Sequence, residues 1–132
     1  MNIIAVDDEK SALNSLQSAI NEAVPNSQLS CFNKSRQALE FARSNQINFA
    51  FLDIEMGGMN GLQLAKHLKE IYCKTIIVFV TGYSEYALDA FALHAGGYLL
   101  KPVTSKAITE VVEHFHSPVQ KQKNNKQPVF PK

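Results

Sequence analysis

Carboxylates follow two short apolar runs of this 132-residue sequence, and they would meet if the runs form neighbouring strands of a parallel sheet. Asp7 and Asp8 come directly after residues 3–6, and Asp53 comes directly after residues 49–52. Converging carboxylates repel one another, and burial raises their pKa values unless a positive charge lies between them. A hard divalent cation supplies that charge, and Mg²⁺ typically binds one or two carboxylates with waters and a phosphate. The pattern therefore predicts an acidic cation site.

Two later apolar runs also end in polar residues, Thr81 and Lys101. An unpaired ammonium in the interior is costly, so Lys101 needs a carboxylate or phosphate partner, and Asp53 is within reach. The Thr81 hydroxyl can exchange a hydrogen bond with an anion in the same pocket, although threonine at the end of a strand is ordinary. Pro102 follows the lysine directly, and about 5–6% of X-Pro bonds are cis, so composition leaves the isomer open.

Strands and helices alternate along the sequence, and this alternation determines where the polar residues lie. Five short apolar runs carry the strand signal, and several are continuous, as strands buried on both faces are. They are residues 3–6, 29–32, 49–52, 76–80 and 98–100. Amphipathic stretches lie between them, and Asn60 and Ser84 fit as N-caps of helices that begin at Gly61 and Glu85.

Five β-α repeats within residues 1–116 predict an α/β fold. Right-handed crossovers leave few topologies, and we expect a flavodoxin-like, doubly wound (βα)5 three-layer sandwich with parallel strand order 2-1-3-4-5. In this class ligands bind at the carboxyl ends of the strands. Residues 117–132 are rich in Pro, Gln, Asn and Lys, so we expect a flexible basic linker or tail there, leading to an output domain absent from this sequence.

Composition favours one globular domain in a reducing compartment. The sequence is 45% hydrophobic and 19% charged, and Cys31 and Cys73 match neither a zinc pattern nor a disulfide framework. No apolar run approaches the roughly 18–20 residues that cross a bilayer, and the N-terminus lacks the basic segment of a signal peptide, so we expect a cytoplasmic protein. Residues 1–116 hold nine Lys/Arg and twelve Asp/Glu, a balance that does not indicate a nucleic-acid surface on the folded part.

Taken together, these residues resemble the receiver domain of bacterial two-component response regulators. The match consists of Asp7 and Asp8, Asp53, the run MGGMNG at residues 56–61, Thr81, and Lys101 with Pro102. Each residue is weak evidence alone, but in this order they form a specific pattern. The resemblance covers residues 1 to about 116, and it implies a regulatory domain rather than an enzyme.

The resemblance implies a chemistry for the acidic cluster. Asp53 would accept a phosphoryl group from the phosphohistidine of a sensor histidine kinase and later lose it by hydrolysis. Mg²⁺ would be the cofactor, with the carboxylates of Asp8 and Asp53 and the backbone carbonyl of Glu55 as ligands, and with Asp7 acting through water.

The resemblance also implies a switch around the acceptor. Lys101 would pair with the acceptor and then with the phosphoryl oxygens, the Thr81 hydroxyl would move onto the phosphoryl group, and Tyr98 would rotate inward behind it. Pro102 is a candidate for a cis bond that redirects the lysine. Gly57 stands where the family often has Pro, so we expect a more flexible loop there.

The implied role is a two-component switch that controls an output, most simply as the input half of a DNA-binding transcriptional regulator. DNA contact would then pass through an output domain outside this sequence, and activation would involve a homodimer through residues 85–93 and 104–115. A stand-alone receiver that acts by protein–protein contacts is the alternative.

Two other classes of protein fit the residues less well. An aspartyl-phosphate phosphatase could use Asp53 as its nucleophile, but it needs a cap or a further acidic motif near a later strand, where this sequence has Thr81 and Gly82. A dinucleotide- or flavin-binding fold needs a Gly-rich turn after the first strand, where this sequence has Asp-Asp-Glu-Lys.

Overall fold

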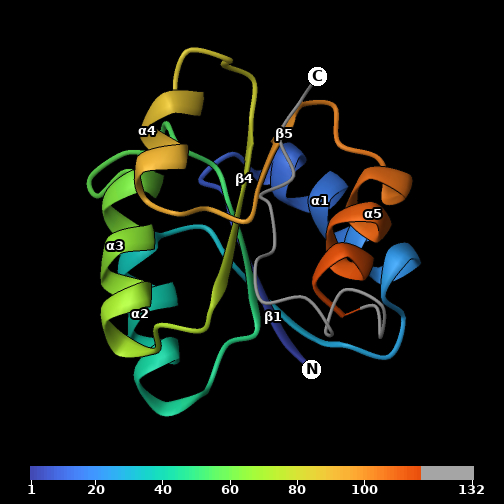
Figure 1. Ribbon diagram of the computed structural model, residues 1–132, viewed down its shortest axis with the longest axis horizontal. Helices are drawn as coiled ribbons and strands as arrows, with labels where there is room; N and C mark the ends of the chain where they lie inside the picture. Colours follow the sequence, from blue (N-terminus) through green and yellow to red (C-terminus); the bar gives the residue numbers. More distant parts are fainter. Residues whose placement is uncertain (117–132) are drawn as a thin grey trace.

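The computed structural model describes residues 1–116, in which five strands form one parallel sheet (Figure 1). The strands are β1 (Asn2–Val6), β2 (Gln28–Phe32), β3 (Phe49–Leu52), β4 (Ile76–Thr81) and β5 (Gly97–Leu100). Their spatial order is β2-β1-β3-β4-β5, which confirms the predicted doubly wound topology. The linker predicted for residues 117–132 lies outside the described residues.

Helices cover both faces of this sheet. They are α1 (Lys10–Ala23), α2 (Ser35–Ser44), α3 (Gly61–Ile71), α4 (Ala87–Ala92) and α5 (Ser105–His116). The helices α1 and α5 lie on one side, and α2, α3 and α4 lie on the other (Figure 1). Within residues 1–116 the longest helix has 14 residues, and no helix there has the length and apolar character that a bilayer crossing requires.

Alternate residues of the central strands serve the two halves of the core. In β3, Phe49 and Phe51 pack in the cluster with α1 and α5, whereas Ala50 and Leu52 pack in the cluster with α2 and α3. All four are fully buried. Burial on both faces explains why this run is continuously apolar in the sequence.

The register of the sheet aligns the carboxyl ends of its central strands. Val6 of β1 lies opposite Leu52 of β3, and the Asp53 N–H donates to the Val6 carbonyl at 2.9 Å. On the other side, the Lys101 N–H donates to the Thr81 carbonyl at 2.9 Å. The residues that follow β1, β3 and β5 therefore emerge at one edge of the sheet.

Of the two predicted helix N-caps, one is confirmed and the other is wrong. Asn60 caps α3 as expected, since its side chain accepts from the Gln63 N–H at 2.9 Å and the Gln63 side chain accepts from the Asn60 N–H at 3.0 Å. The expected cap at Ser84 is wrong: α4 begins at Ala87, and Ser84 contributes its backbone carbonyl to a turn instead. A backbone turn therefore lies between β4 and α4.

Gly61, the first residue of α3, packs against the backbone of Asp53. A Cβ atom on Gly61 would lie 2.0 Å from the Asp53 carbonyl oxygen, so an alanine cannot fit unless α3 or the strand end moves. We expect Gly61→Ala to lower the free energy of unfolding by about 1–3 kcal/mol, the range for overpacking. Denaturant titration measures this.

Gly82→Ala is the matched control, because a Cβ there would meet nothing within 4 Å. We expect its stability to stay within about 0.5 kcal/mol of wild type. Equal stabilities of the two variants would contradict the close approach of α3 to Asp53.

Candidate functional site

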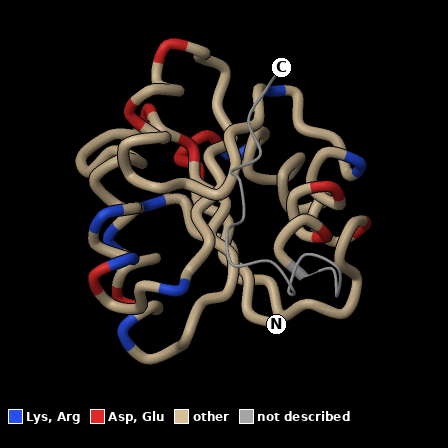
Figure 2. The backbone as a smooth tube through the Cα atoms, in the orientation of Figure 1, with Lys and Arg blue, Asp and Glu red and all other residues tan. Residues whose placement is uncertain are grey.

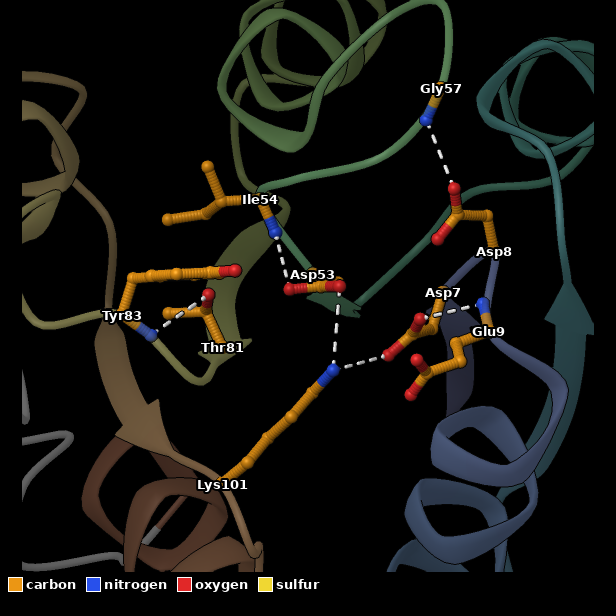
Figure 3. Close-up of polar contacts among 9 residues, drawn as sticks. All are labelled: Asp7, Asp8, Glu9, Asp53, Ile54, Gly57, Thr81, Tyr83 and Lys101. Carbon is orange, nitrogen blue, oxygen red and sulfur yellow. Dashed lines mark hydrogen bonds and ion pairs between the residues drawn. The ribbon is translucent and has the colours of Figure 1, made fainter.

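Three carboxylates meet at the carboxyl edge of the sheet (Figure 3). Asp7 and Asp8 follow β1, Asp53 follows β3, and one oxygen of each lies within 4.8 Å of the others. Asp7 and Asp53 are buried, with exposed fractions of 1% and 7%, whereas Asp8 is exposed. Acidic residues gather along this edge of the molecule (Figure 2). The structure therefore brings together the acids that the sequence singled out.

Backbone N–H groups hold each of these carboxylates in place. Ile54 donates to Asp53 Oδ1 at 2.8 Å, Glu9 donates to Asp7 Oδ1 at 3.0 Å, and Gly57 donates to Asp8 Oδ2 at 3.0 Å. Each donor lies in a loop that continues from β1 or β3. The loops thereby orient one oxygen of each acid and fix where the second oxygen points.

Lys101 supplies the positive charge inside the cluster. Its Nζ donates to Asp7 Oδ2 at 2.8 Å and to Asp53 Oδ2 at 3.4 Å. The ammonium thus bridges the carboxylates that follow β1 and β3 (Figure 3). The Lys101-Pro102 peptide bond is cis. The prediction that this lysine requires a carboxylate partner is confirmed.

Burial and charge act in opposite directions on this cluster. Burial and the neighbouring Asp7 charge raise the pKa of Asp53 above its ordinary value, although Lys101 and the Ile54 N–H partly oppose them. Burial alone would lower the pKa of Lys101, but its bonds to Asp7 and Asp53 outweigh that effect and raise it. The ionised form of Asp53 is therefore destabilised, and the Lys101 ammonium offsets this only in part.

The donor set fits a hard divalent cation. All three acids offer oxygen ligands, which Mg²⁺ and Ca²⁺ prefer, and their oxygens are close enough to share one ion. Three ionised carboxylates and one ammonium leave two negative charges in excess, which one divalent cation balances. A cavity of about 440 Å³ opens beside them. Its lining residues are Asp8, Glu9, Asp53, Glu55, Gly82, Tyr83 and Lys101.

Thr81 and Tyr98 lie on the β4 and β5 side of Asp53. Both are fully buried. The Thr81 Oγ1 accepts from the Tyr83 N–H at 3.4 Å, and the Tyr98 hydroxyl donates to the Tyr83 carbonyl. The Tyr98 ring also packs against Phe79, with centroids 6.4 Å apart. Both residues thus contact the loop between β4 and α4. The Tyr98 ring already lies inward in this structure, so the expected inward rotation has no outward starting position here.

One polar contact at this edge was not anticipated from the sequence. The Tyr86 hydroxyl donates to Glu55 Oε2 at 2.6 Å, and this bond raises the pKa of Tyr86 to about 12. The two residues are 31 positions apart, in loops that follow different strands. Neither periodicity nor a local motif signals such a contact.

Comparison with known proteins yields one family. The model of the response regulator receiver domain matches residues 3–113. The transcriptional regulatory protein YpdB of Escherichia coli (strain K12) is 31% identical over 97% of this chain and 52% of its own length. The transcriptional regulatory protein LytR of Staphylococcus aureus (strain N315) is 30% identical over 95% and 51%. The chain spans about half the length of these curated relatives.

Solved structures agree with the sequence matches. The response regulatory domain of protein MrkE from Klebsiella pneumoniae has a TM-score of 0.76 and 31% identity, covering 93% of this chain and 100% of that domain. A CheY-like receiver domain protein from Methanospirillum hungatei has a TM-score of 0.79, covering 92% of this chain and 98% of that one, and its 21% identity speaks to the fold alone.

The raised pKa of Asp53 predicts how stability depends on pH. The folded protein binds this proton more tightly than the unfolded chain does, so the stability it contributes is full below pH 3.8, the unperturbed value, and is lost as pH rises through the folded pKa. We therefore expect Asp53→Asn, in the presence of a chelator, to unfold a few degrees higher than wild type at pH 7. Thermal melts at several pH values measure this.

The exposed Asp89 of α4 provides the control, and Asp89→Asn should melt at the wild-type temperature at pH 7. The difference in melting temperature between Asp53→Asn and wild type should shrink towards pH 4, where wild-type Asp53 becomes protonated. A variant that is less stable than wild type at pH 7 would contradict the electrostatic account.

Proposed function

The chain belongs to the family of response regulator receiver domains, and we propose that Asp53 is the residue on which it is phosphorylated. As a receiver domain it is a regulatory component of two-component signal transduction. The observation that supports Asp53 most strongly is its position: a nearly buried carboxylate between an acidic pair and an ammonium, at the edge of a 440 Å³ cavity.

The reaction we propose is transfer from the phosphohistidine of a sensor histidine kinase. An Asp53 carboxylate oxygen forms a bond to phosphorus while the nitrogen–phosphorus bond of the donor breaks. Little covalent chemistry is needed beyond this, so positioning and charge neutralisation account for most of the catalysis. Lys101, already within 3.4 Å of Asp53, is placed to neutralise a phosphoryl oxygen.

Asp8, Asp53 and the backbone carbonyl of Glu55 are the residues we propose to hold Mg²⁺, with Asp7 acting through water. A bound Mg²⁺ would supply positive charge to the phosphoryl oxygens that Lys101 does not reach. Asp7 has a second task in this proposal, since it accepts from Lys101 at 2.8 Å and so keeps the ammonium beside the acceptor.

Phosphorylation then acts as a switch through the loop after β4. A phosphoryl group on Asp53 adds about 1.5–2 negative charges and three strong acceptor oxygens. The Thr81 hydroxyl is the nearby donor we expect to turn towards it, and Tyr98, already buried, connects the same loop to the core through its hydroxyl. This couples a charge at Asp53 to the position of α4.

The wider role we propose is control of transcription in the cytoplasm. In this proposal residues 1–116 are the receiver, residues 117–132 link it to a DNA-binding output domain, and phosphorylation promotes a homodimer. The relatives named transcriptional regulatory proteins support this, and they are about twice the length of this chain. The domain itself is a regulatory partner of the kinase rather than an enzyme with an external substrate.

Phosphorylation can be tested with a small-molecule donor. Incubation with acetyl phosphate and Mg²⁺ should add one phosphoryl group to wild type and none to Asp53→Asn, as read by intact mass. Asp89→Asn should gain the adduct as wild type does, because this acid is exposed on α4 and outside the cavity. The same adduct on wild type and on Asp53→Asn would show that the acceptor is another residue.

Cation binding can be tested separately. A ligand that binds only the folded state stabilises it by mass action, so millimolar Mg²⁺ should raise the melting temperature of wild type by a few degrees. Asp8→Asn removes a proposed ligand and should lose more than half of that increase, whereas Asp89→Asn should keep it. Equal increases in all three proteins would contradict a cation site at Asp8.

A further inference from the structure

A hydrogen bond ties the N-cap residue of α4 to the loop after β3, which lines the acceptor cavity. Tyr86, the N-cap residue of α4, donates its hydroxyl to Glu55 Oε2 at 2.6 Å. Glu55 follows Asp53 by two positions and lines the cavity together with Asp53 itself. The bond therefore joins a loop that lines the cavity to the N-cap residue of α4.

Apart from this bond, α4 and its flanks are attached to the core mainly through Ala90 and the partly buried Tyr86, Ala87 and Leu93. Helix α4 has only six residues, of which Ala90 alone is buried. Leu88 and Phe91 are exposed, at 83% and 61%. With so little apolar burial, α4 sits at the low-stability end of the fold, where a single polar contact has a large effect on local opening.

The loop before α4 is attached to the buried core by Thr81 and by Tyr98. The Tyr98 hydroxyl donates to the Tyr83 carbonyl, and the Tyr83 ring meets the Tyr86 ring edge-on, with centroids 6.3 Å apart and planes at 85°. Tyr83 also lines the cavity. The tyrosine pair thus extends from the core, across the cavity rim, to Glu55.

We propose that the Glu55–Tyr86 hydrogen bond, here called the strap, holds the N-terminus of α4 against the loop after β3 and slows hydrolysis of phosphorylated Asp53. The proposal rests on Asp53 being the acceptor. In the hydrolysis, a water oxygen bonds to phosphorus, the bond from phosphorus to the Asp53 oxygen breaks, Asp53 leaves as a carboxylate, and both water protons leave with inorganic phosphate as dihydrogen phosphate. Tyr86 and Glu55 act as positioning residues that limit access of that water.

The strap can be tested without any phosphoryl group. Tyr86→Phe and Glu55→Ala each remove one partner of the bond, and hydrogen exchange of the amides in residues 82–92 should accelerate about threefold to tenfold, the effect of one hydrogen bond. Glu55→Gln keeps an oxygen acceptor and should exchange as wild type does. Unchanged exchange in Tyr86→Phe would overturn the strap.

The second measurement follows the phosphorylated protein. Each variant is loaded with acetyl phosphate and Mg²⁺, the donor is removed, and loss of the adduct is followed by intact mass. Tyr86→Phe and Glu55→Ala should each shorten the half-life by about threefold to tenfold. The double variant should lose its adduct no faster than the faster single variant, because both changes break the same bond.

Matched controls separate the bond from the chemical change itself. Tyr72→Phe removes a tyrosine hydroxyl at the end of α3, and Glu85→Ala removes a negative charge beside Tyr86 without removing the bond. Both should keep the wild-type half-life. Effects of the two single changes that multiply in the double variant, or half-lives that do not shorten, would overturn the proposal.

The two measurements distinguish failure of the strap from failure of the proposed function. A wild-type protein that takes no adduct, or takes it equally as Asp53→Asn, overturns the acceptor assignment and the hydrolysis claim together. Unchanged exchange in the variants overturns the strap even when Asp53 is phosphorylated as proposed.

Discussion

The pairing of one ammonium with two buried carboxylates is the interaction on which the site depends. Lys101 follows β5, while Asp7 and Asp53 follow β1 and β3, so the lysine side chain must reach across the end of β4. Without it, two nearly buried carboxylates would face each other uncompensated, a costly arrangement in a protein interior. With Lys101 in place, the cluster still carries excess negative charge, which a bound divalent cation or protonation of one carboxylate reduces.

The site combines rigid strand ends with a loop and a short helix that can move. The carboxylates sit at the ends of central strands that are fully buried at residues 3–6 and 49–52, and backbone N–H groups fix their orientation. The loop after β4 and the short helix α4 bury little apolar surface, and hydrogen bonds from Tyr98 and Tyr86 help to hold them. A new charge at Asp53 would therefore leave the strands in place and act on the loop and on α4, where stability is lowest.

The sequence was sufficient for the fold and for the residues at the strand ends. Continuous apolar runs revealed strands buried on both faces, and right-handed crossovers then placed Asp7, Asp53 and Lys101 at one edge. Contacts between loops could not be foreseen in this way. The Glu55–Tyr86 bond depends on loop conformations that no periodicity encodes, and the error at Ser84 arose because a turn precedes α4, which is too short to show a helical period.

A crystal structure with Mg²⁺ and beryllofluoride, a mimic of the phosphoryl group, tests the central claim most directly. The account predicts beryllium on Asp53, the cation about 2.0–2.1 Å from oxygens of Asp8 and Asp53, and fluorines in contact with Lys101 and the Thr81 hydroxyl. A beryllofluoride group on any other residue, or a cation that does not touch Asp8, would contradict it.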